Sequence, residues 1–353
     1  MQHNTERIRS VEFDFPLPPE RIAQRPRPYS EQKLAVFGCD TQQTRHKMFN
    51  DLASILRPGD LIVANDSSVV PAALRRDDGV FILIMYPEQQ SLKNVIAICP
   101  SKPEIGDTIE FDRAKYVVKQ HESGWDVYQG DLLSDQPYAS LSEFLQDNGS
   151  TPLPIYIDRP PDVEDESDFQ TVFARNPGSI ACPTAGLHFS EELVADLARH
   201  DIDIITLTLH VGYGTFRRFK SEFVDEHIAD KEHYRVPLAT ARQIGQALKE
   251  GRRIIAVGTT TTRTLESIPE KLAHYEDIEA DLVGETSLFI YPPFEFKVLS
   301  GLITNLAYPR ISVMSLAAAF TGLEQLKEIY REALAHDYLF YTYGDALLAL
   351  KTS

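Results

Sequence analysis

Two compact clusters of glycine, threonine and histidine carry the residue types best suited to chemistry in this sequence. They are PTAGLHF at residues 183–189 and HVGYGTF at residues 210–216. Their histidines, His188 and His210, change charge near neutral pH and therefore suit proton transfer. A single strand–helix–strand unit would deliver both histidines to one pocket. A lone histidine is more often a structural hydrogen-bonding residue, so each cluster by itself leaves both interpretations open.

A third motif, IIAVGTTTTR at residues 254–263, is an apolar run that leads into a Gly/Thr turn and opens a helix. The N–H groups at a helix start, together with hydroxyl groups and Arg263, suit a carboxylate or a phosphate. An N-capping run followed by a surface arginine is an equally good interpretation. The motif is not a P-loop, because GxxxxGK[ST] is absent, and residues 210–216 lack the third glycine of a dinucleotide fingerprint.

The residue spacing gives no support to metal or redox chemistry. Cys39, Cys99 and Cys182 share no metal-like or redox-like spacing, and HExxH is absent. The segment EHIADKEH at residues 226–233 is rich in histidine and acidic residues but shows no ligand spacing. We therefore expect no metal site.

Composition limits the classes of partner. A net charge of −17 over 353 residues argues against extended, non-specific nucleic-acid binding. Small basic groups at residues 75–76, 217–220 and 252–253 are read individually as solvated surface. No apolar run approaches the roughly 20 residues of a membrane span, and the N-terminal segment lacks the apolar region of a signal peptide. A cytoplasmic protein is expected.

The elements that must position these motifs alternate between strand and helix. Strands are predicted at residues 33–37, 61–64, 203–209, 253–257, 288–291 and 338–343, and helices at 49–56, 190–200, 237–250 and 264–275. A capping box of Thr321 and Glu324 predicts a further helix to about residue 335. This alternation favours an α/β core. Between residues 67 and 151, short β-rich runs separated by Pro, Gly and Asp turns predict a small barrel or sandwich.

Taken together, the motifs resemble one family, the S-adenosylmethionine:tRNA ribosyltransferase-isomerases of queuosine biosynthesis. The matching segments follow the family order: PGDLIVAND (58–66), PLPIYIDR (152–159), FQTVFA (169–174), PTAGLHF (183–189), TLHVGYGTF (208–216), EH (226–227), AVGTTTTRTLES (256–267), LFIYP (288–292), LITN (302–305) and YGDA (343–346). The pair formed by PTAGLHF and HVGYGTF is the most specific of these signals.

The resemblance implies both a reaction and a fold. The ribosyl part of S-adenosylmethionine would pass to 7-aminomethyl-7-deazaguanine in a tRNA anticodon loop and rearrange to epoxyqueuosine, with release of adenine and methionine. S-adenosylmethionine would be a co-substrate rather than a permanently bound cofactor. The implied fold is an α/β main domain with a mixed sheet and flanking helices, at residues 1–66 and 152–353, with an inserted β-barrel-like domain at residues 67–151. A monomer is expected.

The resemblance also implies the residues of the site. Proton transfer would fall to His188 and His210, with Glu232 as an alternative base. Thr259, Thr260 and Arg263 would hold the methionine carboxylate, and Tyr213 or Tyr343 would face the sulfonium or the base. The remaining substrate-binding candidates are Asn65, Thr184, Gly186, Gly212, Gly214, Thr215, Asn305 and Asp345.

Several positions depart from the family pattern. Ser68 and Ala73 stand where arginine is usual, and Asp230 replaces a histidine of an H-x-x-H-x-E element. Residues 306–308 read LAY in place of FHL. These departures leave two alternatives open: a diverged paralogue that acts on another acceptor, and a non-catalytic RNA- or nucleoside-binding protein.

Overall fold

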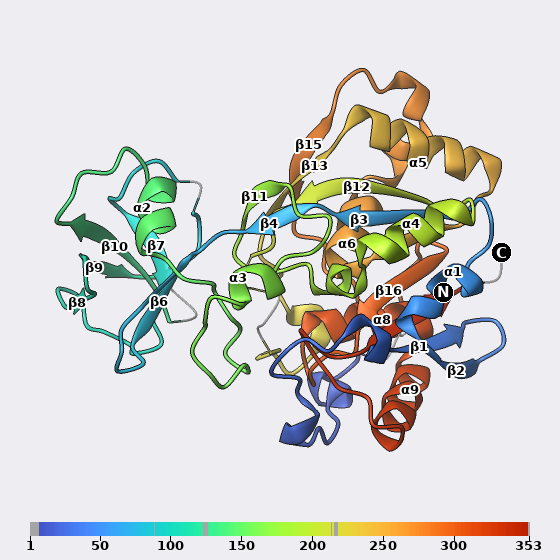
Figure 1. Cartoon of the computed structure of the whole chain (residues 1–353), viewed down its shortest axis with the longest axis horizontal. Coiled ribbons are helices and arrows are strands. Elements are labelled where there is room, and N and C mark those ends of the chain that lie inside the picture. Colours follow the sequence, from blue (N-terminus) through green and yellow to red (C-terminus); the bar gives the residue numbers. More distant parts are fainter. Residues whose placement is uncertain (1–6, 88, 123–125, 213, 215–217, 352–353) are drawn as a thin grey trace.

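A computed structural model describes residues 7–87, 89–122, 126–212, 214 and 218–351. Its centre is a nine-stranded sheet with the order β15-β13-β12-β3-β14-β16-β17-β1-β2 (Figure 1). The strands are β1 (Lys33–Gly38), β2 (Gln43–Met48), β3 (Leu61–Asn65), β12 (Asp203–Leu209), β13 (Glu232–Val236), β14 (Ile254–Val257), β15 (Leu282–Thr286), β16 (Gly301–Asn305) and β17 (Ala346–Leu350).

The sheet is mixed, and its strand directions gather the sequence motifs at one edge. β12, β3, β14 and β16 are parallel, whereas β17 pairs antiparallel with β16, and β1 runs parallel to β17. The carboxyl ends of the four parallel strands therefore meet the starts of β17 and β1. The polar clusters that follow β3, β12 and β14 lie at this edge, which is where open α/β sheets bind ligands.

Helices cover both faces of the sheet. Alternate residues of β3 point into different cores: Leu61 and Val63 pack with α5, α6, α8 and α9, and Ile62 and Ala64 pack with α1 and α4. This double burial explains why β3 reads as a continuous apolar run. The helices are α1 (Leu52–Ile55), α4 (Glu191–Arg199), α5 (Leu238–Glu250), α6 (Gly258–Ser267), α7 (Pro269–Ala273), α8 (Ser312–Thr321) and α9 (Leu323–Ala335).

The ends of the predicted helices follow the capping rules. The Ser190 hydroxyl accepts a hydrogen bond from the Leu193 N–H (3.1 Å) and begins α4. Gly251, with φ 68° and ψ 23°, ends α5 in the left-handed conformation that glycine adopts at low cost. The helix after β14 begins at Gly258, earlier than the predicted residue 264, so the threonine-rich motif forms the first turns of α6.

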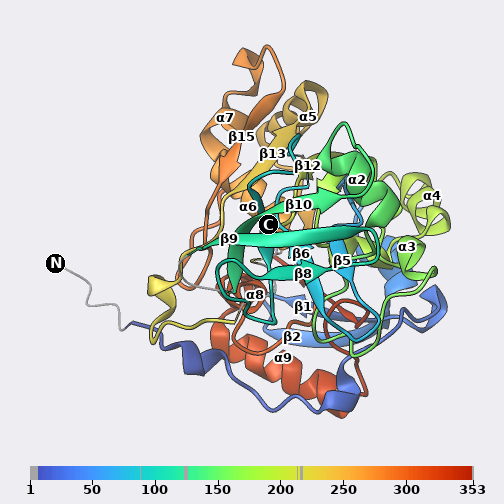
Figure 2. The ribbon, with the colours of Figure 1, turned by 90° about the vertical axis from the view of Figure 1, so that its left-hand side faces the viewer.

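A second sheet is antiparallel throughout and lies beside the main body (Figure 1; Figure 2 views the molecule from its side). Its order is β5-β6-β7-β10-β9-β8, formed by β5 (Ala73–Arg75), β6 (Phe81–Ile84), β7 (Val95–Ile98), β8 (Thr108–Glu110), β9 (Ala114–His121) and β10 (Val127–Ser134). The sheet curls around its own core, to which α2 (Leu141–Asn148) contributes Leu141, Phe144 and Leu145. A two-stranded parallel link, β4 (Ser67–Val69) with β11 (Asn176–Ser179), lies between the two sheets.

Three local predictions are wrong. Residues 338–343 form turns and an isolated bridge rather than a strand, because Tyr341 has a φ of 79° and the strand follows at β17. Residues 288–291 form no strand, and the Leu288 carbonyl accepts a hydrogen bond from Arg263 instead. The capping box is absent: Thr321 ends α8 with its hydroxyl donating to the Ala317 carbonyl (3.0 Å), and Gly322 precedes α9.

Candidate functional site

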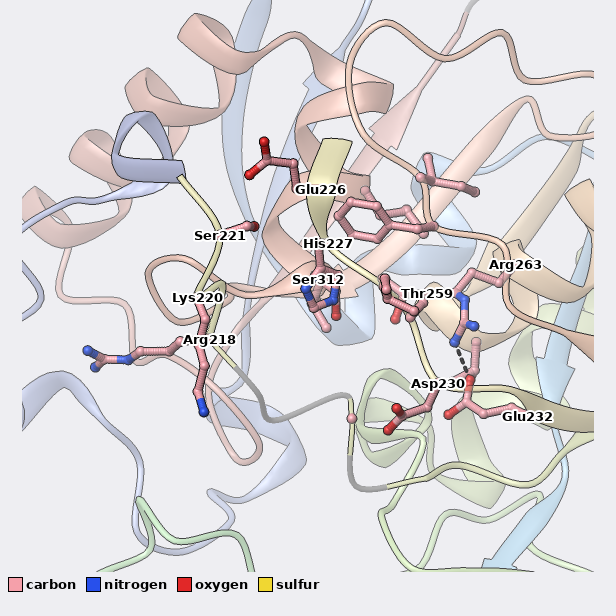
Figure 3. A pocket seen from close by; sticks show the side chains of 18 residues that line it. Arg218, Lys220, Ser221, Glu226, His227, Asp230, Glu232, Thr259, Arg263 and Ser312 are labelled. Atoms are coloured by element: carbon pink, nitrogen blue, oxygen red, sulfur yellow. Dashed lines mark hydrogen bonds and ion pairs between the residues drawn. The ribbon is translucent and has the colours of Figure 1, made fainter. Parts of the chain in front are cut away.

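A cavity of about 240 Å³ opens at the edge where the motifs meet (Figure 3). Its walls come from the start of α6, the start of β13, segment 218–230 and the start of α8. Five of the predicted site residues line it: Gly214, Glu232, Thr259, Thr260 and Arg263. The cavity thus brings together residues of two separate sequence motifs and of the acidic segment between them.

Glu232 and Arg263 form the charged centre of this cavity. Arg263 Nη1 and Glu232 Oε2 make an ion pair (dashed in Figure 3), with side-chain exposures of 15% and 5%. Arg263 Nε donates to the Leu288 carbonyl (2.8 Å), and the Gly212 N–H donates to Glu232 Oε1 (2.9 Å). Both carboxylate oxygens of Glu232 therefore have a partner. The bond from Gly212 also links the glycine cluster at residues 210–216 to the start of β13.

The threonine run supplies the rest of the inner wall. Thr262 and Thr264 donate to carbonyls one turn earlier in α6, which satisfies their hydroxyls inside the helix. Thr259 and Thr260 line the cavity, and the first N–H groups of a helix have no partner within it. The start of α6 consequently offers hydrogen-bond donors and a positive dipole end to an anion.

Gly214 and Asp230 approach each other closely in the cavity wall. A Cβ atom at position 214 would lie 2.5 Å from Asp230 Oδ2, so a larger residue there would require the Asp230 side chain to move. Asp230, at one of the departures from the family pattern, lies beside Glu232 in the cavity (Figure 3). This wall therefore carries two carboxylates, of which that of Glu232 is paired with Arg263.

An aromatic wall was missed by the sequence analysis. The ring of His227 lies 4.7 Å from that of Phe289, which stacks on Tyr291 at 5.4 Å. His227 and Phe289 line the cavity, and such a wall suits a sulfonium or a nucleobase. The signal was present in the matching segments EH and LFIYP, but His227 was weighed only as a metal ligand.

His188 is an interior residue. It is 3% exposed, its Nδ1 is 2.8 Å from Gln32 Oε1, and its ring stacks on Phe49 at 4.8 Å. Burial lowers the pKa of His188 to about 4, although the neighbouring Asn305 side chain opposes this shift. The imidazole is therefore neutral at physiological pH, and it does not line the cavity around Glu232.

The lowered pKa of His188 predicts a loss of stability in acid. The unfolded chain, with a histidine pKa near 6.5, takes up a proton more readily than the folded protein. The stabilisation is complete above about pH 6.5 and is lost as the pH falls towards 4, by about 2 kcal/mol between pH 6.5 and 5. Urea unfolding at several pH values measures it. A His188→Gln variant should show a shallower decline, and identical declines would contradict the prediction.

His210 lies at the carboxyl end of β12. It follows β12 directly, and its N–H donates to the His233 carbonyl (3.0 Å). Its ring lies against Gly178 of β11, where a side chain would clash. The contacts of His188 and His210 therefore diverge, and the hypothesis that both histidines build one pocket gains no support from these contacts. Their catalytic roles stay predictions.

A smaller cavity of about 40 Å³ adjoins the first, because Val313 lines both. Thr184 and Asn305, two predicted site residues, line it together with the rings of Tyr156 and Tyr341. Asn305 Nδ2 donates to the carbonyls of Tyr341 (2.9 Å) and Thr342 (3.1 Å), which holds the turn that follows α9.

Asn65 and Asp345, both predicted to bind substrate, are engaged within the protein. The Asn65 side chain bonds with the backbone N–H and carbonyl of Leu209 (3.0 and 2.9 Å) and so ties β3 to β12. Asp345 is fully buried and accepts hydrogen bonds from the N–H groups of Lys33 and Leu339 (both 2.7 Å) and from Arg27. Burial raises the pKa of Asp345, and these donors oppose the rise.

Of four further predicted site residues, two pack against other side chains and two lie outside the described residues. Gly186 packs against Thr171, and the buried ring of Tyr343 lies 6.4 Å from Phe169. Tyr213 and Thr215 lie outside the described residues. Across the described part of the chain, there is no group of three or more histidine, cysteine or acidic side chains able to hold a metal, and no helix long and apolar enough to span a membrane.

The departures from the family pattern are spread over the fold. Ser68 lies in β4, and Ala73 is buried in β5. Leu306 and Ala307 line the smaller cavity, and the ring of Tyr308 lies under the guanidinium of Arg218 (4.3 Å). Of these described departures, Asp230 lines the main cavity, and Tyr308 contacts Arg218, which also lines it.

The comparison with known proteins settles the family. A family profile described as "Queuosine biosynthesis protein" matches residues 10–349. The chain belongs to this family. Among relatives named S-adenosylmethionine:tRNA ribosyltransferase-isomerase, that of Thermotoga maritima is 41% identical over 346 residues, covering 96% of this chain and 99% of the relative. Those of Chlorobaculum parvum and Halothermothrix orenii are 37% and 35% identical, with the same coverage.

A solved structure is similar to this one over nearly the whole chain. The crystal structure of S-adenosylmethionine tRNA ribosyltransferase from Thermotoga maritima covers 96% of this chain and 100% of its own, with a TM-score of 0.54 and 32% identity. The likeness supports the fold of the family, a mixed sheet with flanking helices and a curled antiparallel sheet.

Proposed function

We propose that this protein is an S-adenosylmethionine:tRNA ribosyltransferase-isomerase. It transfers the ribosyl part of S-adenosylmethionine to 7-aminomethyl-7-deazaguanine in tRNA and isomerises the product to epoxyqueuosine, releasing adenine and methionine. Relatives of that name are 35–41% identical over nearly the full chain. The observation that carries the proposal is the cavity that gathers Glu232, Arg263 and Thr259 from separate motifs.

The reaction demands a base next to the sulfonium. The positive sulfur acidifies the adjacent C5′ protons, one of which must be removed before the sugar rearranges. Glu232 is the candidate base, because its carboxylate lies in the cavity within hydrogen-bond distance of a backbone N–H and an arginine that fix its position. His188 and His210 lie outside the cavity wall, so the geometry favours Glu232 among the three.

The cavity walls are complementary to the carboxylate, sulfonium and adenine groups of S-adenosylmethionine. The start of α6, with Thr259, Thr260 and the adjacent Arg263, offers the methionine carboxylate donors and positive charge. The wall of His227 and Phe289 faces the sulfonium or the departing adenine. The acceptor nucleotide must leave its stack in the anticodon loop to reach this cavity.

The proposal also includes a division of the chain into two domains. Residues 67–151 would form an inserted barrel-like domain within a main domain made of residues 1–66 and 152–353. The separate core of the second sheet supports this division. We place the protein in the cytoplasm, as a monomer, with S-adenosylmethionine as co-substrate and without a resident cofactor.

Adenine release from S-adenosylmethionine tests the function directly. We expect release, followed by chromatography, only when tRNA that carries the deazaguanine precursor is present. Hydrolysis of the product tRNA to nucleosides should yield epoxyqueuosine. Release without that tRNA would point to another acceptor, and binding without release would point to a non-catalytic protein; either result contradicts the proposal.

A further inference from the structure

The mouth of the main cavity carries two cations on a short, fixed segment. Phe219 is 3% exposed, packs against Phe13 and Phe289 (5.9 Å each), and donates its N–H to the Arg310 carbonyl (2.7 Å). Arg218 forms an isolated antiparallel bridge with Ile311. Because side chains alternate in extended backbone, burial of Phe219 turns Arg218 and Lys220 outward together.

Both cations are exposed and line the cavity mouth. Figure 3 shows them pointing away from Asp230 and Glu232, on the far side of the opening. The cavity therefore has a cationic rim and a wall that carries carboxylates. A ligand that bridges the two must be anionic where it meets the rim and cationic or neutral where it enters.

Stacking prepares Arg218 for this ligand. Its guanidinium carbon lies 4.3 Å from the centroid of the Tyr308 ring, and among the described residues no carboxylate pairs with it. A guanidinium that stacks through its face keeps its N–H groups in the plane and available for a bidentate contact with phosphate. The ring limits the conformations of the side chain, so less freedom is lost on binding.

We infer that Arg218 and Lys220 form a phosphate clamp for the RNA strand that presents the acceptor nucleotide. The inference rests on the proposed function. An RNA nucleotide that enters the cavity brings phosphodiesters on both sides of its ribose, and these must be held outside while the base goes in. Its aminomethyl group, a cation, then meets the wall of Asp230 and Glu232. The chain as a whole carries a net charge of −17 and repels RNA. We therefore expect the two cations at the cavity mouth to determine where the RNA strand binds.

Salt-dependent RNA binding tests the clamp without turnover. Fluorescence anisotropy of a labelled anticodon stem-loop, between about 50 and 200 mM salt, gives the slope of log affinity against log salt. Each of Arg218→Ala and Lys220→Ala should weaken binding roughly tenfold and reduce the slope by about 0.7. Tyr308→Leu should weaken binding less, and Tyr308→Phe, which keeps the ring, should match the wild type.

An exposed arginine far from the cavity supplies the matched control. Arg45→Ala, in β2 at the far end of the sheet order, should leave affinity and slope unchanged. In steady-state assays, Arg218→Ala and Lys220→Ala should raise the KM for tRNA and leave the KM for S-adenosylmethionine at its wild-type value. A raised KM for S-adenosylmethionine, or an unchanged salt slope, would overturn the inference.

The assays separate the clamp from the reaction. Inorganic phosphate serves as the competing small anion, and displacement of the stem-loop by low phosphate concentrations would assign the rim to free phosphate and overturn the RNA clamp. If the variants reduce the salt slope as expected but the wild type releases no adenine, the proposed function fails and the clamp stands. If adenine is released and the variants bind RNA normally, only the clamp fails.

Discussion

Replacement of Glu232 by glutamine is expected to lower kcat/KM for tRNA-dependent adenine release by about 10²–10⁴-fold, the usual contribution of a general base. Glutamine keeps the size of the side chain and can still accept from the Gly212 N–H, but it cannot take a proton. Steady-state release of adenine with precursor tRNA measures the effect. Glu285→Gln is the matched control, because Glu285 is exposed on the neighbouring β15 and does not line the cavity.

Loss of the Glu232 charge also leaves Arg263 without its partner in a buried site. Breaking such a pair costs about 3–5 kcal/mol of stability, so activity must be compared on folded protein. The double variant Glu232→Gln, Arg263→Gln removes both charges, and it should recover stability while staying inactive. Activity of the folded single variant within about threefold of wild type would remove Glu232 from the role of base.

Asp345→Ala is expected to lower the free energy of unfolding by about 3–5 kcal/mol at neutral pH. The substitution leaves the Lys33 and Leu339 N–H groups and the partly buried Arg27 without their acceptor. Urea denaturation measures the change. Glu276→Ala should cost much less stability, because the carboxylate of Glu276 is 67% exposed in its ion pair with Lys249.

The same pair of variants decides between two roles for Asp345. The family resemblance implies that Asp345 binds substrate, whereas its hydrogen bonds join the start of β1 to the turn before β17. A large loss of stability supports the structural role. An Asp345→Ala protein that is as stable as the wild type but has a raised KM for S-adenosylmethionine would support substrate binding instead.

Local sequence pattern predicted the elements whose signals are local. β3 and β14 are short apolar runs between turn residues, and the end of α5 is marked by a glycine that adopts the required positive φ. The strand predicted at residues 338–343 is absent because the conformation of this segment depends on a contact with Asp345, which the local pattern does not show. Asp345 holds the Leu339 N–H, and Tyr341 takes a positive φ that no aromatic pattern reveals.

The candidate site shows the same division. Short contiguous motifs of the sequence were enough to predict Glu232, Thr259 and Arg263. The aromatic wall of His227 and Phe289 and the contact of Arg218 with Tyr308 join segments far apart in the chain, so no single string carries them. Basic residues 218 and 220 read as ordinary surface until the burial of Phe219 shows that they face one opening.

The pairing of β1 with β17 has a consequence for synthesis of the protein on the ribosome. Leu34 pairs with Ala346, and Gly38 pairs with Leu350. The N-terminal strand β1 therefore cannot complete its pairing until the C-terminal strand β17 has been synthesised. Until residue 350 has left the exit tunnel, β16 and β1 each present an unpaired edge inside an incomplete apolar layer. Because unpaired edges of this kind favour aggregation, the nascent chain is most exposed to aggregation before β17 is complete.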